Sequence, residues 1–261
     1  MGRFHLDEQR VQDMFRKVIP GTTSRLTMVD HTETYGRHVL SKIVKDLDVS
    51  LCVDLGCGNG DDLIIVKKHN PKCELIGVDF GDWNKEKLIN RGVNPISVNI
   101  ENQRLPFGDE TIDLLIANQI LEHTKEIYWI NHEIFRTLKV GGCLYVGVPN
   151  VLSLHNRILG LLGIHPTCIK MISAHVRAFS KNDTILFYRE IAGRFAVVDN
   201  FHGSQFYPFP KSLARPLATL FPSLAFSIFF LIRKTERYQG EFVEWLSKSP
   251  LETNFYAGHD L

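Results

Sequence analysis

The sequence predicts a doubly wound α/β fold with a seven-stranded, mostly parallel sheet, an antiparallel last strand and a helical insert after the fifth strand. Two observations carry this prediction. Apolar runs of strand length alternate with helical patterns between residues 51 and 148, which is typical of parallel sheets with crossover helices. Polar residues also end successive apolar runs, as expected at the ligand-binding edge of an open α/β sheet.

The elements follow one another at the spacing that such a sheet requires. The strands are expected at 51–55, 74–79, 95–99, 112–117, 142–148, 194–201 and 224–232. The helices are expected at about 34–47, 60–69, 83–90, 125–138, 152–162, 181–192 and 211–220. Ser180 and Asp183 can cap the helix that begins at residue 181. The glycine pair at 141–142 is expected to end the helix before the fifth strand.

The chain of 261 residues, 44% of them hydrophobic, is long enough for one domain with a large core. We expect this domain over residues 1–237, with an N-terminal helical cap at 1–48 and two substrate-side inserts at 151–180 and 203–222. Residues 238–261 are expected to form a C-terminal tail.

Charge and cysteine usage argue against a nucleic-acid partner, a zinc site and a disulfide framework. The formal net charge of +1 gives no overall field that would attract nucleic acid, so we expect no nucleic-acid partner. The five cysteines show no C-x-x-C spacing, which argues against a zinc site and a disulfide framework, and we expect no bound metal. Free cysteines suit a reducing compartment, and the N-terminal residues lack the apolar core of a signal peptide. A cytoplasmic location is therefore expected.

The turn after the first strand is the most informative segment, because Gly56, Gly58 and Gly60 alternate there with other residues. Glycine permits a left-handed backbone against which a ligand can lie, and a helix N-terminus attracts anions. A dinucleotide loop would keep glycine where Asp61 stands, and no Gly-Lys-Ser/Thr triplet of a P-loop follows. An acidic residue, Asp54, precedes the glycines instead. The alternative is an ordinary glycine-rich turn without a ligand.

This register resembles the first motif of the class I S-adenosylmethionine (SAM)-dependent methyltransferases, which have a Rossmann-like fold. The resemblance implies SAM as the cofactor, with the first contacts made by Asp54, Gly56, Cys57, Gly58 and Gly60.

Two further motifs narrow the resemblance. Leu121-Glu122-His123 follows the fourth strand, and Leu138-Lys139-Val140-Gly141-Gly142 precedes the fifth, with Val140 in place of the usual proline. These motifs resemble the small-molecule methyltransferases of the ubiquinone/menaquinone-biosynthesis type, methyltransferase type 11. The resemblance is specific over about residues 50–150 and looser to about residue 235.

Three more strand ends are expected to contact the cofactor. The Asp79 carboxylate can accept hydrogen bonds from ribose hydroxyls, with Phe80 beside it, and a helix cap or turn is its alternative role. The resemblance implies that Asn99 takes the adenine amino group in place of the usual acid, and that Ile100 offers the next backbone N–H. Asn118 ends the fourth strand at the same edge.

Methyl transfer to a hydroxyl needs an aligned acceptor and a base for its proton, and histidine is the natural base near neutral pH. His123 follows the fourth strand and His175 lies in the expected lid, so both are candidate catalytic residues. Each can instead be a structural residue of its loop. Tyr35, Arg37 and His155 are candidates for substrate contact, and a solvated helix face or lid surface is their alternative.

The leading hypothesis is a SAM-dependent methyltransferase that O-methylates a small molecule or a sugar of a surface-glycan pathway, so a small-molecule or glycan acceptor is expected. A quinone or other lipidic precursor is the nearest alternative, and a catalytically silent SAM-fold binding module is the alternative of another class. Apolar residues in 206–221 could give peripheral contact at the inner face of a membrane. Pro216 and Pro222 leave no span of about 20 apolar residues. The sequence leaves the oligomeric state open.

Overall fold

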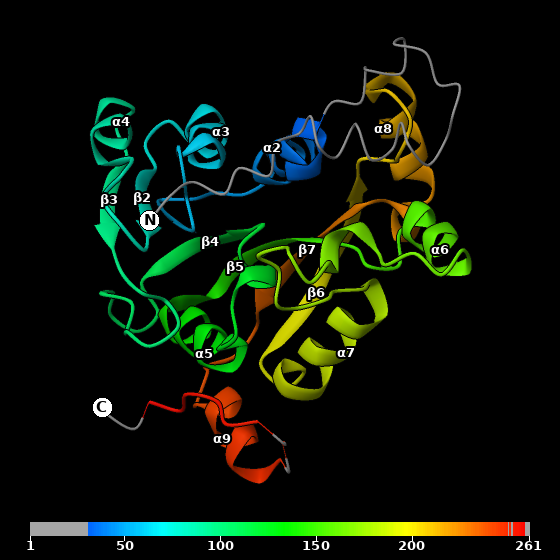
Figure 1. Ribbon diagram of the computed structural model, residues 1–261. Coiled ribbons are helices and arrows are strands. Elements are labelled where there is room, and N and C mark those ends of the chain that lie inside the picture. Colours follow the sequence, from blue (N-terminus) through cyan, green and yellow to red (C-terminus); the bar gives the residue numbers. More distant parts are fainter. Residues whose placement is uncertain (1–30, 250, 252, 259–261) are drawn as a thin grey trace.

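One seven-stranded sheet organises the part of the chain that the computed structural model describes, residues 31–249, 251 and 253–258 (Figure 1). The strands lie in the order β3-β2-β1-β4-β5-β7-β6, and β7 is antiparallel to both neighbours while every other pair is parallel. The strands are β1 (Leu51–Leu55), β2 (Glu74–Asp79), β3 (Asn94–Ser97), β4 (Ile112–Asn118), β5 (Leu138–Pro149), β6 (Ala196–Ser204) and β7 (Ser227–Lys234). The predicted α/β class and the antiparallel last strand are confirmed.

Helices cover both faces of this sheet (Figure 1). Residues of α2, α3 and α4 join one core cluster, and residues of α5, α7 and α9 join the other. Alternate residues of β4 belong to different clusters, Leu114 to the first and Leu115 to the second, as strand pleating requires. The helical segments are η1 (His31–Tyr35), α2 (Arg37–Val44), α3 (Asp61–His69), α4 (Lys85–Asn90), η2 (Leu121–His123), α5 (Ile127–Thr137), α6 (Leu154–Leu161), η3 (Thr167–Ile169), α7 (Lys181–Ala192), α8 (Lys211–Leu220), η4 (Pro222–Leu224) and α9 (Glu241–Lys248).

The junction between α5 and β5 differs from its prediction. The helix ends at Thr137, and Leu138 is already extended with φ −67° and ψ 135°, so the glycine pair at 141–142 does not cap it. Lys234 Nζ instead donates to the carbonyls of Phe135 and Leu138, at 2.9 and 2.7 Å. The predicted glycine cap is wrong because a buried lysine from β7 meets the free carbonyl groups at the helix end.

The N-terminal cap docks on elements from the second half of the chain. Glu33 of η1 is 4% exposed and accepts two hydrogen bonds from Arg215 of α8, at 2.7 and 2.8 Å. Ser204 Oγ of β6 donates to the Glu33 carbonyl at 2.6 Å. Gly36 has φ +55°, and a Cβ there would lie 2.2 Å from the Phe229 ring of β7. These contacts hold α2 against the sheet.

The predicted tail contributes a helix to the core. α9 buries Phe242, whose ring stacks on Phe135 of α5 with centroids 5.6 Å apart, and Trp245 stacks on Tyr128 at 5.1 Å. The start of the predicted N-terminal cap, residues 1–30, lies outside the described part of the chain. Among the residues that the structure describes, none of the helices has the length and apolarity to cross a bilayer.

Candidate functional site

β1 passes into α3 through a loop in which three alternate glycines adopt a left-handed backbone. Gly56, Gly58 and Gly60 have φ of +68°, +50° and +74°, a region that residues with a side chain rarely occupy. A Cβ on Gly56 would lie 2.7 Å from Ile120, and one on Gly60 would lie 2.8 Å from Leu88. A Cβ on Gly58 would meet no atom within 4 Å. Packing therefore requires two of these glycines, while Gly58 faces open space in which a ligand can lie against the backbone.

Asp79 ends β2 beside this loop. Its Oδ2 accepts a hydrogen bond from Gly58 N at 3.2 Å, and its Oδ1 accepts one from Phe80 N at 2.8 Å. The carboxylate is thus fixed at the open side of the loop, which is the position that a ribose-binding acid needs. The alternative role as a helix cap does not fit, because α4 begins only at Lys85.

The predicted adenine contact lies beyond its strand. β3 ends at Ser97 rather than at residue 99, and Asn99 opens a turn in which its Oδ1 accepts a hydrogen bond from Glu101 N at 3.1 Å. The backbone N–H of Asn99 donates to Gln103 Oε1 at 2.7 Å, and Ile100 packs half-buried against the core. An adenine amino group would have to use the second lone pair of the Asn99 oxygen. The adenine roles of Asn99 and Ile100 stay predictions.

Asn118, at the end of β4, joins a buried polar network. Its Nδ2 donates to Asp62 Oδ2 at 2.6 Å and to the Tyr35 carbonyl at 3.0 Å. Arg37 Nε donates to the other oxygen of Asp62 at 3.1 Å, and its guanidinium lies 4.7 Å from the Tyr35 ring centroid. Burial raises the pKa of Asp62, although the contacts to Asn118 and Arg37 act in the opposite direction. The structure therefore brings Tyr35 and Arg37 to the edge where α3 begins.

Two residues of the glycine-loop motif are buried. Burial raises the pKa of Asp54 well above its usual range, and the nearby charges of Asp62 and Asp79 add to the effect. Burial also raises the pKa of Cys57 to about 12, so its thiol stays protonated near neutral pH and is a poor nucleophile. Cys57 N donates to the Val78 carbonyl at 3.1 Å, which anchors the loop to β2.

The two predicted catalytic histidines come together although they are distant in sequence. The rings of His123 and His175 meet edge to face with centroids 4.6 Å apart. Buried Glu122 lies beside them, with Oε1 3.9 Å from His123 Nε2. Burial lowers the pKa of His123, with His175 adding to the effect, and burial raises the pKa of Glu122 to about 8. One acid and two imidazoles therefore meet after the end of β4.

His155 is half-buried and makes polar and ring contacts within the inserts. Its Nδ1 and Nε2 lie 3.1 Å from Ser153 Oγ and Thr167 Oγ1, and its ring contacts Tyr207 and Phe226. Burial lowers the pKa of His155 to about 4, so the ring is neutral at physiological pH. His155 thus joins the two predicted inserts, and its contact with a substrate stays a prediction.

Three polar residues at this edge, Asp62, Gln119 and Glu122, are absent from the predicted site. Gln119 follows β4 with φ +56°, and its buried Nε2 has no hydrogen-bond partner within the described residues. A left-handed glutamine with an unpaired amide is a feature that functional sites share. Asp62 reads in the sequence as an ordinary acid near a helix N-terminus, and only the fold shows its pairing with Arg37.

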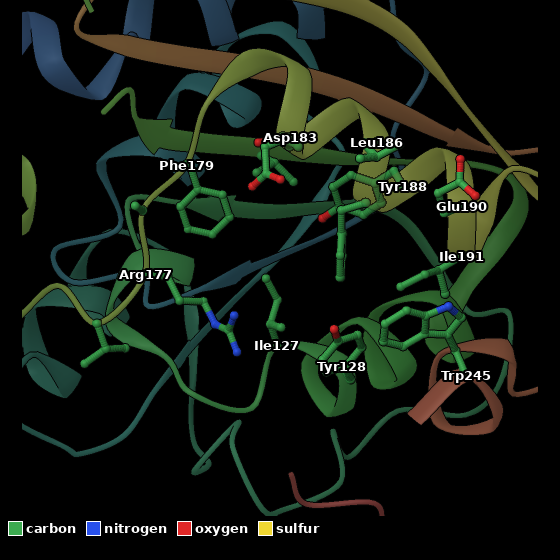
Figure 2. A pocket seen from close by; sticks show the side chains of 15 residues that line it. Ile127, Tyr128, Arg177, Phe179, Asp183, Leu186, Tyr188, Glu190, Ile191 and Trp245 are labelled. Atoms are coloured by element: carbon green, nitrogen blue, oxygen red, sulfur yellow. The ribbon is translucent and has the colours of Figure 1, made fainter. Parts of the chain in front are cut away.

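A cavity of about 520 Å³ lies between α5, α7 and α9 (Figure 2). Figure 2 shows Arg177, Tyr128 and Trp245 around it, from three different parts of the chain. None of the predicted site residues lines this cavity, so it is separate from the glycine loop.

Residues 53–146 match the family model described as a methyltransferase domain. The chain is 32% identical over 113 residues to trans-aconitate 2-methyltransferase of Enterobacter sp. (strain 638). The aligned residues make up 43% of this chain and 44% of that protein. This chain is also 27% identical over 160 residues to demethylmenaquinone methyltransferase of Lactococcus lactis. Here the aligned residues make up 56% of this chain and 62% of that protein. The chain spans only 34–44% of the length of three of the curated relatives that it matches.

The fold itself is shared with solved structures. One is the Burkholderia thailandensis 1,6-didemethyltoxoflavin-N1-methyltransferase with bound 1,6-didemethyltoxoflavin and S-adenosylhomocysteine. The TM-score is 0.53 at 14% identity, over 90% of this chain and 92% of that chain. At this identity the likeness establishes the arrangement of strands and helices alone.

Proposed function

Because the chain carries a class I SAM-dependent methyltransferase domain, we propose that it transfers the SAM methyl group to a hydroxyl of a small molecule or of a surface-glycan sugar. One observation carries the proposal. The open face of Gly58 and the Asp79 carboxylate are joined by a hydrogen bond of 3.2 Å at the carboxyl edge of the sheet. A bare backbone next to a strand-end acid fits a nucleoside with free ribose hydroxyls.

SAM, when bound, would supply a methyl group that is activated by its sulfonium sulfur. The residues of the chain must align the acceptor and remove its proton. The hydrogen bonds of His123 and His175 suit removal of that proton. His123 Nδ1 lies 3.3 Å from the Ala174 carbonyl oxygen, and His175 Nδ1 lies 2.6 Å from the Cys168 carbonyl oxygen. A carbonyl only accepts, so each Nδ1 carries the hydrogen and each Nε2 keeps a lone pair for a proton.

Calorimetry with SAM and a transfer assay with radiolabelled SAM test the proposal. We expect SAM to bind, and labelled product to form in pools of hydroxylated small molecules, sugar nucleotides or glycans. His175→Ala should reduce turnover at least tenfold with unchanged SAM affinity, because the ring contacts the insert and His123 rather than the glycine loop. Failure of SAM to bind would refute the proposal, and binding without transfer to any pool would favour the silent binding module.

A second candidate acceptor, a quinone or other lipidic precursor, draws support from the surface of the inserts. Residues 151–182 and 200–235 contain no aspartate or glutamate. Large apolar side chains are exposed there, with Leu161 88%, Met171 100% and Ile172 79% exposed. Apolar side chains beside basic ones favour peripheral contact with an anionic membrane.

The predicted membrane segment at 206–221 lies at the same end of the molecule, since α6 and α8 are found together there (Figure 1). A ring contact between His155 and Tyr207 at 5.1 Å joins the two inserts. Leu220 and Phe221, at the end of α8, are exposed.

Sedimentation with vesicles that contain anionic lipid tests this second candidate. The parent protein should sediment with the vesicles, and the double substitution Met171→Asp and Ile172→Asp should reduce the bound fraction at least fivefold. Ile89→Asp on α4 is the matched control, because Ile89 is also exposed but lies at the opposite end of the molecule. A parent protein that stays in the supernatant would refute membrane contact.

A further inference from the structure

Glu122, His123 and His175 form a group of three potential metal ligands, the Glu-His-His cluster. Each residue offers one ligand atom, and these atoms all lie within 4.8 Å of one another. Glu122 and His123 belong to η2, while His175 comes from the insert that follows β5. Cysteine spacing, which led to the expectation of no metal, says nothing about a cluster built from histidine and glutamate.

The hydrogen bonds of the two rings leave the metal-binding atoms free. His123 Nδ1 donates to the Ala174 carbonyl and His175 Nδ1 donates to the Cys168 carbonyl, so both Nε2 atoms keep an unshared lone pair. Metal-binding histidines are held by this kind of bond in known proteins, because it fixes the tautomer and the ring orientation. The Oε2 atom of Glu122 is buried and has no hydrogen-bond partner within the described residues. A bound cation would supply the partner that this oxygen lacks.

Backbone hydrogen bonds hold the two halves of the cluster together. The N–H groups of Val176 and Arg177 both donate to the Glu122 carbonyl, at 2.8 and 3.2 Å. Arg177 Nε donates to the Thr124 carbonyl at 3.1 Å. The position of His175 beside η2 therefore does not depend on a cation, and the ligand set is largely formed in advance.

The segment that carries Glu122 and His123 approaches the glycine loop through Ile120. Ile120, just before η2, is the residue whose side chain a Cβ on Gly56 would meet at 2.7 Å. The chain therefore passes from the glycine-loop contact at Ile120 to two of the cluster residues within three positions.

We propose that the Glu-His-His cluster binds one divalent first-row transition-metal ion, such as Zn²⁺, Mn²⁺ or Fe²⁺, and leaves open positions for an oxygen of the acceptor. Two imidazoles and one carboxylate suit these ions, whereas Ca²⁺ and Mg²⁺ prefer oxygen ligands alone. This assignment rests on the proposed methyl transfer to a hydroxyl. The acceptor O–H would bind the ion and lose its proton to solvent water, and its oxygen would then form the new bond to the methyl carbon as the carbon–sulfur bond breaks. The histidines would then act through the ion instead of taking the proton themselves.

Binding of metal alone tests the site without any assay of activity. Full-length protein, stripped with a chelator, is titrated with Co²⁺ and Zn²⁺ by calorimetry and by the visible absorption of bound Co²⁺. We expect one saturable site in the parent protein. Glu122→Gln and His175→Ala should each weaken Co²⁺ binding at least tenfold. His165→Ala is the matched control, because His165 is an exposed histidine of the same insert, and its affinity should equal that of the parent.

Two results would overturn the assignment: no saturable Co²⁺ absorption in the parent, or equal Co²⁺ affinity in the parent, Glu122→Gln and His175→Ala. Thermal denaturation of each variant shows whether it is folded, and Glu122→Asp, which keeps the charge but shortens the side chain, serves if His175→Ala does not fold. SAM calorimetry on the metal-free parent separates the two proposals. SAM binding without metal binding refutes the metal site alone, and loss of SAM binding refutes the proposed methyl transfer.

Discussion

At Gly58 the requirements of folding and of cofactor binding can be separated. Its φ of +50° should cost a residue with a side chain about 1–2 kcal/mol, and an added Cβ would meet no atom within 4 Å. Gly58→Ala should therefore lower stability by about 1–2 kcal/mol, roughly 2–8 °C in Tm, without disturbing the packing.

The same methyl group would occupy the space in which the cofactor lies against the loop. Inserting a methyl group into a well-packed contact costs about 1–3 kcal/mol, which corresponds to roughly 5–150-fold weaker SAM binding. Gly58→Val places two further methyl groups in that space and should abolish binding.

Calorimetry with SAM and thermal denaturation measure the two effects separately. Gly92, in the turn after α4, is the matched control, because it has φ +72° and an added Cβ there would also meet nothing within 4 Å. Gly92→Ala should show a similar loss of Tm with unchanged SAM affinity. Parent-like SAM affinity in Gly58→Ala, or an equal loss of affinity in Gly92→Ala, would refute the placement of the cofactor.

Asp79→Ala should weaken SAM binding by about 1–3 kcal/mol, since a charged hydrogen bond to ribose is lost; equal calorimetric affinity would refute that contact. Glu33→Gln should lower the free energy of unfolding by about 1–3 kcal/mol, because Arg215 loses a buried carboxylate partner. Burial alone would raise the pKa of Glu33, but the contacts to Arg215 and His38 hold this pKa below its usual 4.5. The stabilisation by the Glu33 carboxylate is therefore complete above about pH 4.5 and is lost as the pH falls through the lowered pKa of the folded state. A Tm difference between parent and Glu33→Gln that stays constant in acid would contradict this pH dependence. Lys234→Met should lower stability by about 1–3 kcal/mol, because two buried carbonyls lose their donor; an unchanged urea midpoint would count against this.

Local sequence patterns were enough to predict the sheet and the position of the glycine loop between β1 and α3. Alternating apolar runs place all seven strands, since each strand is specified by its own residues. The glycine register and Asp79 predict neighbouring sites because parallel strands bring their carboxyl ends to one edge. The structure then joins Gly58 and Asp79 by a hydrogen bond.

Contacts between remote segments were beyond the reach of these patterns. His123 and His175 were each plausible as a base, but their meeting with Glu122 depends on the path of the insert. The helix before β5 lacks its predicted glycine cap for the same kind of reason, since Lys234 reaches it from β7. Asp62 shows the point again, because its partner Arg37 lies on another helix.

The docking of the N-terminal cap on β6 and α8 limits the order in which the chain can fold during synthesis. Glu33 contacts Ser204 and Arg215, which follow it by 171 and 182 residues. At about 5–20 residues per second, a ribosome delivers these partners roughly 9–36 s after Glu33. Until then α2 can already pack through Val39 and Leu40 on the cluster that includes Leu63 and Val66 of α3, but η1 lacks the contacts that Ser204 and Arg215 give it. A nascent chain can therefore complete the glycine loop and the contact of Arg37 with Asp62 well before Glu33 meets its partners on β6 and α8.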